Sequence, residues 1–260
     1  MVTSSSDGRL NFWSLANLRE PAESMQVGHS ISSLAVSPES ESLLVGDEHG
    51  FLYAVSSSTT PTGQRSGRRQ AKQLGTVDEE GENHGHYGLV TSLAAKSAVK
   101  QGSRGAATGT ALSKGFVRGI PGLMLSTGVD WTVKLWAPAY SDRPLFSLVS
   151  HSYDYMSDVM WSPTHPSLFA TASSNGTIGL WNLATSFEEP ITGTDGIAIG
   201  EGGGLNKLSW SLDGRRLAVA AADRVHVLSL SDDVVSRNKS ADEESKVMHQ
   251  LLSRGWIDRP

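Results

Sequence analysis

The sequence has no cysteine and no long hydrophobic segment. None of its 260 residues is a cysteine, which excludes disulfides and thiolate metal sites and agrees with a reducing compartment. No apolar run approaches the roughly 20 residues that a membrane-spanning helix needs. Residues 1–8 lack the basic and apolar regions of a signal peptide. These absences predict a soluble intracellular chain.

A large excess of charge of one sign is also missing. Lys and Arg total 22, Asp and Glu total 27, and the net charge is −5, a balance that does not indicate nucleic acid or an anionic membrane as partner. Helical periodicity is scarce as well. The chain has instead 27 glycines, 7 tryptophans and many short alternating apolar runs, which together predict an all-β fold.

One short segment recurs along the chain. Trp13, Trp136 and Trp181 each follow a turn-forming Asp or Asn by six positions, and small residues lie just upstream of that turn. Two weaker copies end in Val55 and Leu228 instead. Successive segment ends lie 42, 81, 45 and 47 residues apart, and a four-stranded propeller blade takes roughly 40–45 residues. The recurrence therefore predicts a β-propeller.

Within each interval, short apolar or alternating runs are separated by Asp-Gly, Asn-Gly or Ser-Pro, the residues typical of tight turns. A tryptophan at the end of a third strand is expected to wedge between neighbouring blades, where burial of the ring contributes about 2–3 kcal/mol. Nine strands are predicted in this way, over residues 31–36, 42–45, 51–55, 156–161, 168–172, 177–181, 205–210, 216–220 and 225–228.

The long interval of 81 residues contains two low-complexity stretches, 56–83 and 97–119. Their composition predicts flexible insertions in a propeller that otherwise covers residues 1–230. Such stretches either contact an acidic partner surface or are simply solvated. The first one carries a basic group, which consists of Arg65, Arg68, Arg69 and Lys72.

Residues 231–260 follow the last predicted blade as a polar tail. A capping box at 240–243 and an apolar stripe at helical spacing predict a helix over 241–253. This helix either packs on the propeller or on a partner, or it frays.

The recurring segments resemble WD repeats. Gly28-His29, Asp130 with Trp136, and His151 with Trp181 stand where that family has its Gly-His and Trp-Asp signatures, although the Asp that usually follows each Trp is absent. The resemblance implies a seven-bladed plan, of which this chain would supply four to five blades. Residue 1 then falls inside the second strand of a blade, which predicts an incomplete ring. The residues expected to have structural roles in the repeats are Trp13, His29, Asp130, Trp136, His151 and Trp181.

Two longer stretches, 126–136 and 153–166, resemble cytoplasmic dynein intermediate chains more closely than generic WD repeats. The resemblance implies a non-catalytic scaffold in the cytoplasm, associated with microtubules, whose propeller docks on the dynein heavy-chain tail. Light chains and dynactin would bind a more N-terminal region. The alternative is a WD-repeat adaptor of another assembly, such as a ubiquitin-ligase receptor. A propeller enzyme would need acids or histidines converging on the central channel, and no such set is legible.

Aromatic residues at strand ends are the candidate partner contacts. Trp131 lies in a tight turn that does not require it, and Tyr153, Tyr155 and His165 are predicted to cluster near one blade. Such residues are the usual anchors of protein interfaces. The alternative for Trp131 is packing on the neighbouring blade.

Metal, cofactor and catalytic sites have little support in the sequence. His84 and His86 lie two residues apart beside Glu82, but no third ligand is evident, and one histidine is expected to fill the Gly-His position of a repeat. The Gly-rich run 200–204 lacks the strand and helix of a phosphate loop. No catalytic residue, cofactor or metal is predicted.

Overall fold

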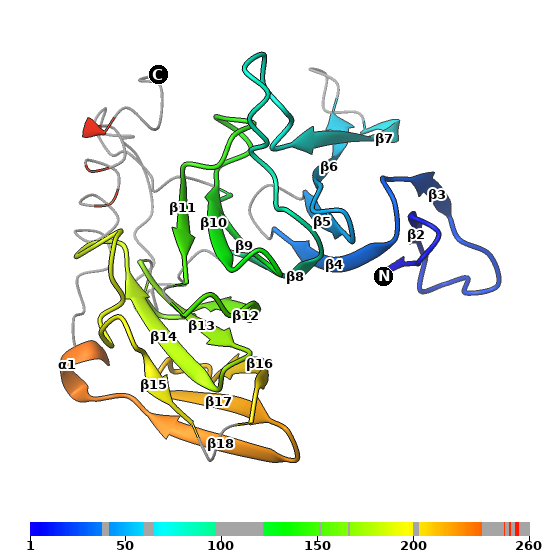
Figure 1. The fold of residues 1–260 in the computed structure, drawn as a ribbon. Coiled ribbons are helices and arrows are strands. Elements are labelled where there is room, and N and C mark those ends of the chain that lie inside the picture. Colours follow the sequence, from blue (N-terminus) through cyan, green and yellow to red (C-terminus); the bar gives the residue numbers. More distant parts are fainter. Residues whose placement is uncertain are drawn as a thin grey trace, which may run out of the picture.

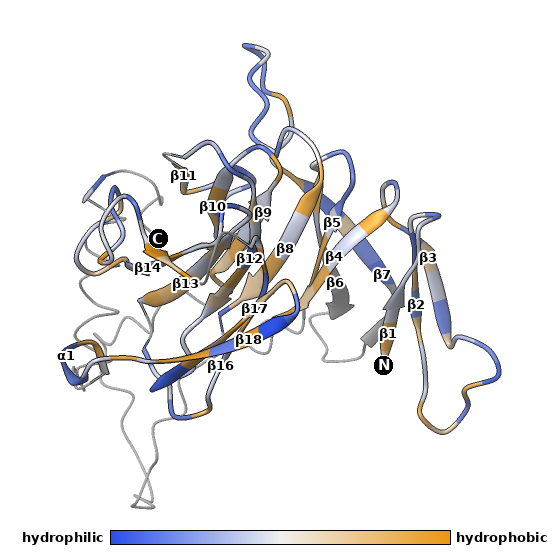
Figure 2. Ribbon diagram, turned by 60° about the horizontal axis from the view of Figure 1, so that its bottom comes forward, coloured by the Kyte–Doolittle hydropathy of each residue, from blue (hydrophilic) through white to orange (hydrophobic). Residues whose placement is uncertain are grey.

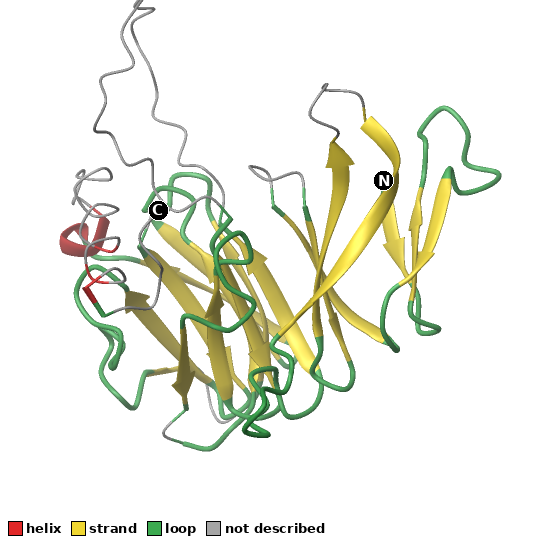
Figure 3. Ribbon diagram, turned by 90° about the horizontal axis from the view of Figure 1, so that it is seen from above, coloured by secondary structure: helices red, strands yellow, loops and turns green. Residues whose placement is uncertain are grey.

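The computed structural model describes residues 1–37, 42–59, 65–96, 122–150, 152–165, 167–199 and 203–235, together with Val247, Gln250, Ser253 and Arg254. These residues form five antiparallel sheets and almost no helix (Figures 1 and 3). Within each sheet the strands follow one another in chain order, which is the meander expected of propeller blades. The predicted all-β class is confirmed.

Each sheet is one blade, numbered along the chain. Blade 1 contains β1 (Val2–Ser4), β2 (Arg9–Phe12) and β3 (Glu23–Gln26). Blade 2 contains β4 (Ile31–Val36), β5 (Leu43–Asp47), β6 (Leu52–Thr59) and β7 (Arg65–Leu74). Blade 3 contains β8 (Val90–Ala95), β9 (Met124–Gly128), β10 (Thr132–Trp136) and β11 (Phe146–Val149). Blade 4 contains β12 (Met156–Trp161), β13 (Leu168–Ser173), β14 (Thr177–Asn182) and β15 (Ile197–Ala198). Blade 5 contains β16 (Leu205–Trp210), β17 (Arg216–Ala221) and β18 (Arg224–Ser229).

The blades are arranged radially, so that β4, β8, β12 and β16 lie side by side near the centre (Figure 1). Side chains on these inner strands join one blade to the next. The Ser32 hydroxyl donates to the Val90 carbonyl at 2.7 Å, and the Trp161 indole donates to the Ala94 carbonyl at 3.1 Å. The fold is thus a partial WD-type propeller of five blades, as the spacing predicted. The seven-bladed plan stays a prediction.

The hydrophobic core is divided into four clusters, each lying between two neighbouring blades. Trp136 of blade 3 is 2% exposed and packs with residues of blade 2, including Leu44, Leu52 and Leu74. Trp181 of blade 4 packs in the same way in the cluster that joins blades 3 and 4. The predicted wedging of third-strand tryptophans between blades is therefore confirmed at both positions.

The nine predicted strands are all present. Three of them, β4, β12 and β16, have the predicted bounds, and the others differ by one to four residues at an end. The largest difference is in β6, which continues to Thr59 because it pairs with a fourth strand that the sequence did not reveal.

The prediction of a flexible insertion over residues 56–83 is wrong for residues 56–59 and 65–74, which belong to β6 and β7. Residues of β7 pair with β6 from Leu74 opposite Leu52 to Arg65 opposite Thr59, so this segment completes blade 2. Figure 2 colours β7 as hydrophilic along most of its length. Such a composition resembles a loop, yet it suits an outer strand whose ordering comes from backbone pairing. The expected insertion at 97–119 lies outside the described residues.

The basic residues of β7 were expected either to contact an acidic partner or to be solvated, but two of them, Arg69 and Lys72, contact neighbouring blades. The Arg69 guanidinium forms an ion pair with Glu23 of blade 1 at 3.2 Å and lies 4.0 Å from the centre of the Phe12 ring. Lys72 forms an ion pair with Asp142 of blade 3. These two cations therefore connect blade 2 to both of its neighbours. The side chains of Arg65 and Arg68 lie outside the described residues.

The C-terminal tail begins with a short helix, α1 (Asp232–Val235). The helix expected at 241–253 lies mostly outside the described residues, but Val247, Gln250 and Ser253 are helical. Val247 is buried in the cluster between blades 3 and 4, and the Arg254 guanidinium lies 5.4 Å from the centre of the Phe187 ring. These contacts favour packing on the propeller. No helix in the described part of the chain is long and apolar enough to cross a membrane.

Candidate docking face and the buried histidine network

A chain of buried polar side chains holds the turn between β9 and β10 against the loop that precedes β8. The Trp136 indole donates to the Ser126 hydroxyl at 2.8 Å, and that hydroxyl lies 2.7 Å from Nε2 of His86. Nδ1 of His86 lies 2.9 Å from the Asp130 carboxylate. His86, which is 1% exposed, thus fills the Gly-His position of its repeat, as expected for one of the two neighbouring histidines.

The direction of the hydrogen bonds follows from the indole. Because the indole N–H can only donate, the Ser126 oxygen accepts from it and its own hydrogen points to Nε2 of His86. The remaining hydrogen of a neutral His86 is then on Nδ1, where it is donated to Asp130. Burial lowers the pKa of His86 below its ordinary value, although the hydrogen bond that His86 donates to Asp130 opposes the shift. Burial would raise the pKa of Asp130, but hydrogen bonds from His86, Tyr87 and Thr132 lower it to about 2.

The depressed pKa of His86 predicts acid sensitivity. The unfolded chain takes up a proton at this histidine near pH 6.5, while the folded chain resists it. The stabilising contribution is therefore complete above about pH 6.5 and is lost as the pH falls through the folded-state pKa, with a slope of at most about 1.4 kcal/mol per pH unit. Thermal melts between pH 8 and pH 5 measure this slope. We expect His86→Gln to be less stable at pH 8 and to have a shallower slope, whereas an unchanged slope would contradict this role.

The other predicted repeat residues only partly reproduce this network. The Trp13 indole donates to Thr3 at 2.9 Å and the Trp181 indole to Thr171 at 3.2 Å, so all three repeats share the indole-to-hydroxyl bond. The ring of His29 was expected to hydrogen-bond within its blade. Instead this ring is exposed, lies 4.4 Å from that of His49, and only its backbone N–H reaches Asp47. His151 lies outside the described residues.

Three of the four candidate contact residues meet on one face of the propeller. Trp131 lies in the β9–β10 turn, and Tyr153 and Tyr155 lie in the loop before β12; they are 43%, 67% and 46% exposed. The Trp131 and Tyr153 rings pack edge to face with their centres 5.6 Å apart. Trp131 belongs to none of the hydrophobic clusters between blades. Its exposure favours an interface over packing on a neighbouring blade.

The fourth candidate, His165, was expected beside these aromatics and is not there. It follows β12, whereas Tyr155 precedes that strand, so the two lie at opposite ends of a six-residue strand. His165 is also buried, at 7% exposed, and its backbone N–H donates to the Ser162 hydroxyl. The expectation failed because nearness in sequence was taken for nearness in space across the length of a strand.

The same face holds residues that the sequence did not single out. Tyr87 is 68% exposed, and its backbone N–H donates to the Asp130 carboxylate beside Trp131. Leu89, just before β8, and Val149, at the end of β11, are exposed at the same end of blade 3 as the β9–β10 turn. Tyr87 directly follows the Gly-His pair of its repeat, and this position in the sequence could have identified it as a candidate contact residue. We call Tyr87, Trp131, Tyr153 and Tyr155 the aromatic face.

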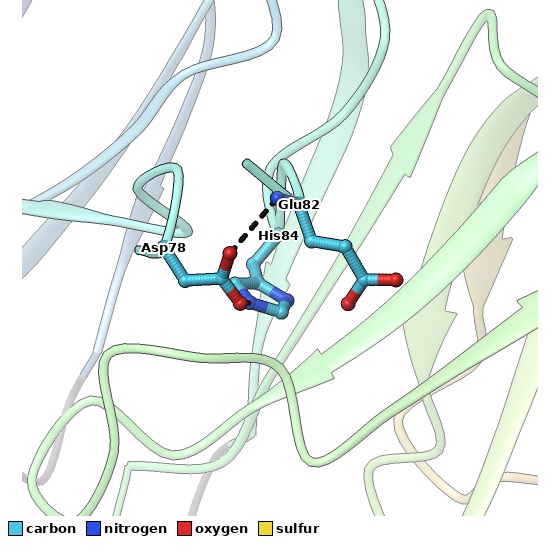
Figure 4. A group of neighbouring side chains, drawn as sticks. All are labelled: Asp78, Glu82 and His84. Carbon is cyan, nitrogen blue, oxygen red and sulfur yellow. Dashed lines mark hydrogen bonds and ion pairs between the residues drawn. The ribbon is translucent and has the colours of Figure 1, made fainter. Parts of the chain in front are cut away.

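A third possible metal ligand appears in the loop after β7, where the sequence showed only histidines and Glu82. Asp78, Glu82 and His84 each offer an atom within 4.8 Å of the others (Figure 4). Asp78 already accepts the backbone N–H of Glu82 at 2.8 Å and lies 2.9 Å from Nε2 of His84. The hydrogen bond with His84, together with those from the backbone N–H groups of Glu82 and Glu80, lowers the pKa of Asp78. The group therefore braces its own loop, and we assign no metal to it.

The blades and the buried network define the class: the chain forms part of a WD-repeat β-propeller. The family of the WD domain, G-beta repeat, matches residues 142–182, which include β11 to β14. The chain is also similar to cytoplasmic dynein 1 intermediate chain of Drosophila melanogaster, with 31% identity over 254 residues that cover 95% of this chain and 33% of that protein. It thus spans about a third of this relative's length. The resemblance to dynein intermediate chains is confirmed.

Proposed function

We propose that this chain is part of a non-catalytic scaffold subunit of a cytoplasmic dynein complex, and that its propeller docks on the heavy-chain tail. The observation that carries the proposal is the similarity to a dynein intermediate chain over 95% of the chain. The subunit would support microtubule-based transport in the cytoplasm, and other dynein subunits, the light chains and dynactin, would bind outside this chain.

The polar residues at the centre of the propeller support a scaffold role. Asp158, on the inner strand β12, accepts hydrogen bonds from Ser92 on β8 and from the backbone N–H of Leu208 on β16. This buried carboxylate thus joins three blades. A carboxylate held in this way stabilises the assembly of blades, because its lone pairs are already occupied by fixed donors.

Affinity purification of the full-length protein, followed by mass spectrometry, tests the proposal. We expect the dynein heavy chain to be recovered with the tagged subunit in amounts close to one to one. Components of a ubiquitin ligase or of another assembly, without any dynein subunit, would instead favour an adaptor role elsewhere. Trp136→Ala, which should destabilise the propeller without changing the rest of the subunit, is the comparison: recovery of the heavy chain should fall while subunits that bind outside the propeller are retained.

A further inference from the structure

The turns β1–β2, β5–β6, β9–β10 and β13–β14 each place one residue in the left-handed backbone region, and in blade 5 the shorter β17–β18 turn places Ala222 there with φ of 49°. In blades 1, 2 and 4 that residue is Gly8, Gly50 or Gly176, with φ between 82° and 92°. In blade 3 it is Trp131, with φ of 65°. Glycine adopts this conformation without steric cost, whereas a large side chain is strained there. The turn itself would thus be better served by glycine, as three other blades demonstrate.

The strained tryptophan has a strained partner. Tyr153 also has a positive φ, of 55°, and its ring contacts that of Trp131 edge to face. The two residues are 43% and 67% exposed. One aromatic residue from a turn within blade 3 and one from the connection to blade 4 therefore occupy unfavourable backbone conformations and meet on the surface without contributing to a core. Strain that folding does not require indicates a function.

The loops and turns around this pair carry acids but no Lys or Arg, whereas Lys134 of the adjoining strand β10 is buried, donates to Ser147 and interacts electrostatically with Asp130. Residues 27–31, 47–51, 85–90, 129–132 and 149–156 make up the neighbouring loops and turns, and they contain no Lys or Arg. They contain four acids, of which Glu48 and Asp154 are at least partly exposed, whereas the side chains of Asp47 and Asp130 are buried and accept hydrogen bonds from their own turns. Asp130 lies directly beneath the aromatic face, because it accepts the backbone N–H of Tyr87. Aromatic rings combined with negative charge attract cationic groups, since a cation is stabilised over a ring face.

We propose that the aromatic face binds a segment of a partner protein through Lys or Arg side chains placed over the rings of Trp131 and Tyr153. Tyr87 and Tyr155 extend the platform on either side. The identity of the partner rests on the proposed function, under which the basic segment belongs to the dynein heavy chain. The chemistry of the site is independent of that choice.

Trp131→Gly separates binding from folding. The variant introduces the residue that three equivalent turns already have, so we expect its melting temperature to equal or exceed that of the wild type. Loss of an interface anchor should weaken binding to the purified heavy-chain tail by at least about tenfold. Trp131→Phe should retain most of the affinity. Leu212→Ser, which changes an exposed residue in the β16–β17 turn, should retain all of it. A lower melting temperature for Trp131→Gly, or unchanged affinity, overturns the proposal.

A photo-crosslinking amino acid at position 153 of the full-length protein identifies the partner segment in the assembled complex. We expect crosslinks to a heavy-chain segment that contains Lys or Arg, and Trp131→Gly should abolish them. Crosslinks to a basic segment of a protein outside dynein would support the site and refute the proposed function. Crosslinks to an acidic or uncharged segment, or no crosslinks, would refute the site even where the heavy chain co-purifies.

Discussion

Replacing Trp136 with alanine should lower the free energy of unfolding by about 3–5 kcal/mol, because the substitution opens a large cavity between two blades. The ring is 2% exposed and contacts residues of blade 2 as well as its own blade. Its indole N–H also donates a hydrogen bond to the Ser126 hydroxyl, which in turn is hydrogen-bonded to His86. Chemical denaturation of the full chain measures the loss.

Trp131 offers a control five residues away in the same hairpin. Trp131→Gly removes the same type of side chain from a surface position, so we expect no loss of stability. Trp136→Phe keeps most of the buried area but removes the indole N–H, and should therefore cost less than Trp136→Ala. If Trp136→Ala and Trp131→Gly had equal effects, the tryptophan would not wedge between blades as described.

Asp158→Ala should destabilise the chain by about 2–4 kcal/mol, since it leaves two buried donors without their acceptor. The carboxylate is buried and accepts from the Ser92 hydroxyl and from the backbone N–H of Leu208 at 2.8 Å. These donors belong to blades 3 and 5, so the substitution weakens two blade interfaces at once. A thermal or denaturant melt measures the effect.

Lys207→Ala is the matched comparison for Asp158. Its ammonium group also reaches the Asp158 carboxylate, at 3.1 Å, but its side chain is 65% exposed. An exposed ion pair contributes little because water competes for both charges, so we expect a loss of less than about 1 kcal/mol. A double variant that lost no more than Asp158→Ala alone would agree with this assignment. A larger effect of Lys207→Ala than of Asp158→Ala would contradict it.

Strands that are partly or wholly buried could be predicted, because their side chains must be apolar at regular positions. β12 and β16 have the predicted bounds for this reason. β7 could not be predicted, because an outer strand is ordered by hydrogen bonds of its backbone, which leave no trace in side-chain hydropathy. Its arginine and lysine side chains made it resemble a solvated loop.

The candidate site shows the same division. Trp131 could be selected because a tryptophan is not required in a tight turn, and Tyr153 because it is an aromatic residue close to the start of a predicted strand. Their contact with each other, and the hydrogen bond that holds Tyr87 to Asp130 beside Trp131, depend on the packing of segments that are far apart in the chain. His165 was misplaced for the complementary reason, since a strand of six residues carries the chain from one face of the propeller to the other.

By itself, the sequence determined the class of fold, the period of the blades and the tryptophans that fill the spaces between them, because these follow from local turn geometry and from which side chains must leave water. Only the tertiary structure decided that His86 meets Asp130 across 44 positions of the chain, that β7 is a strand, and which aromatic residues share a surface. These outcomes depend on contacts between distant segments, and such contacts form only once the blades have packed against each other.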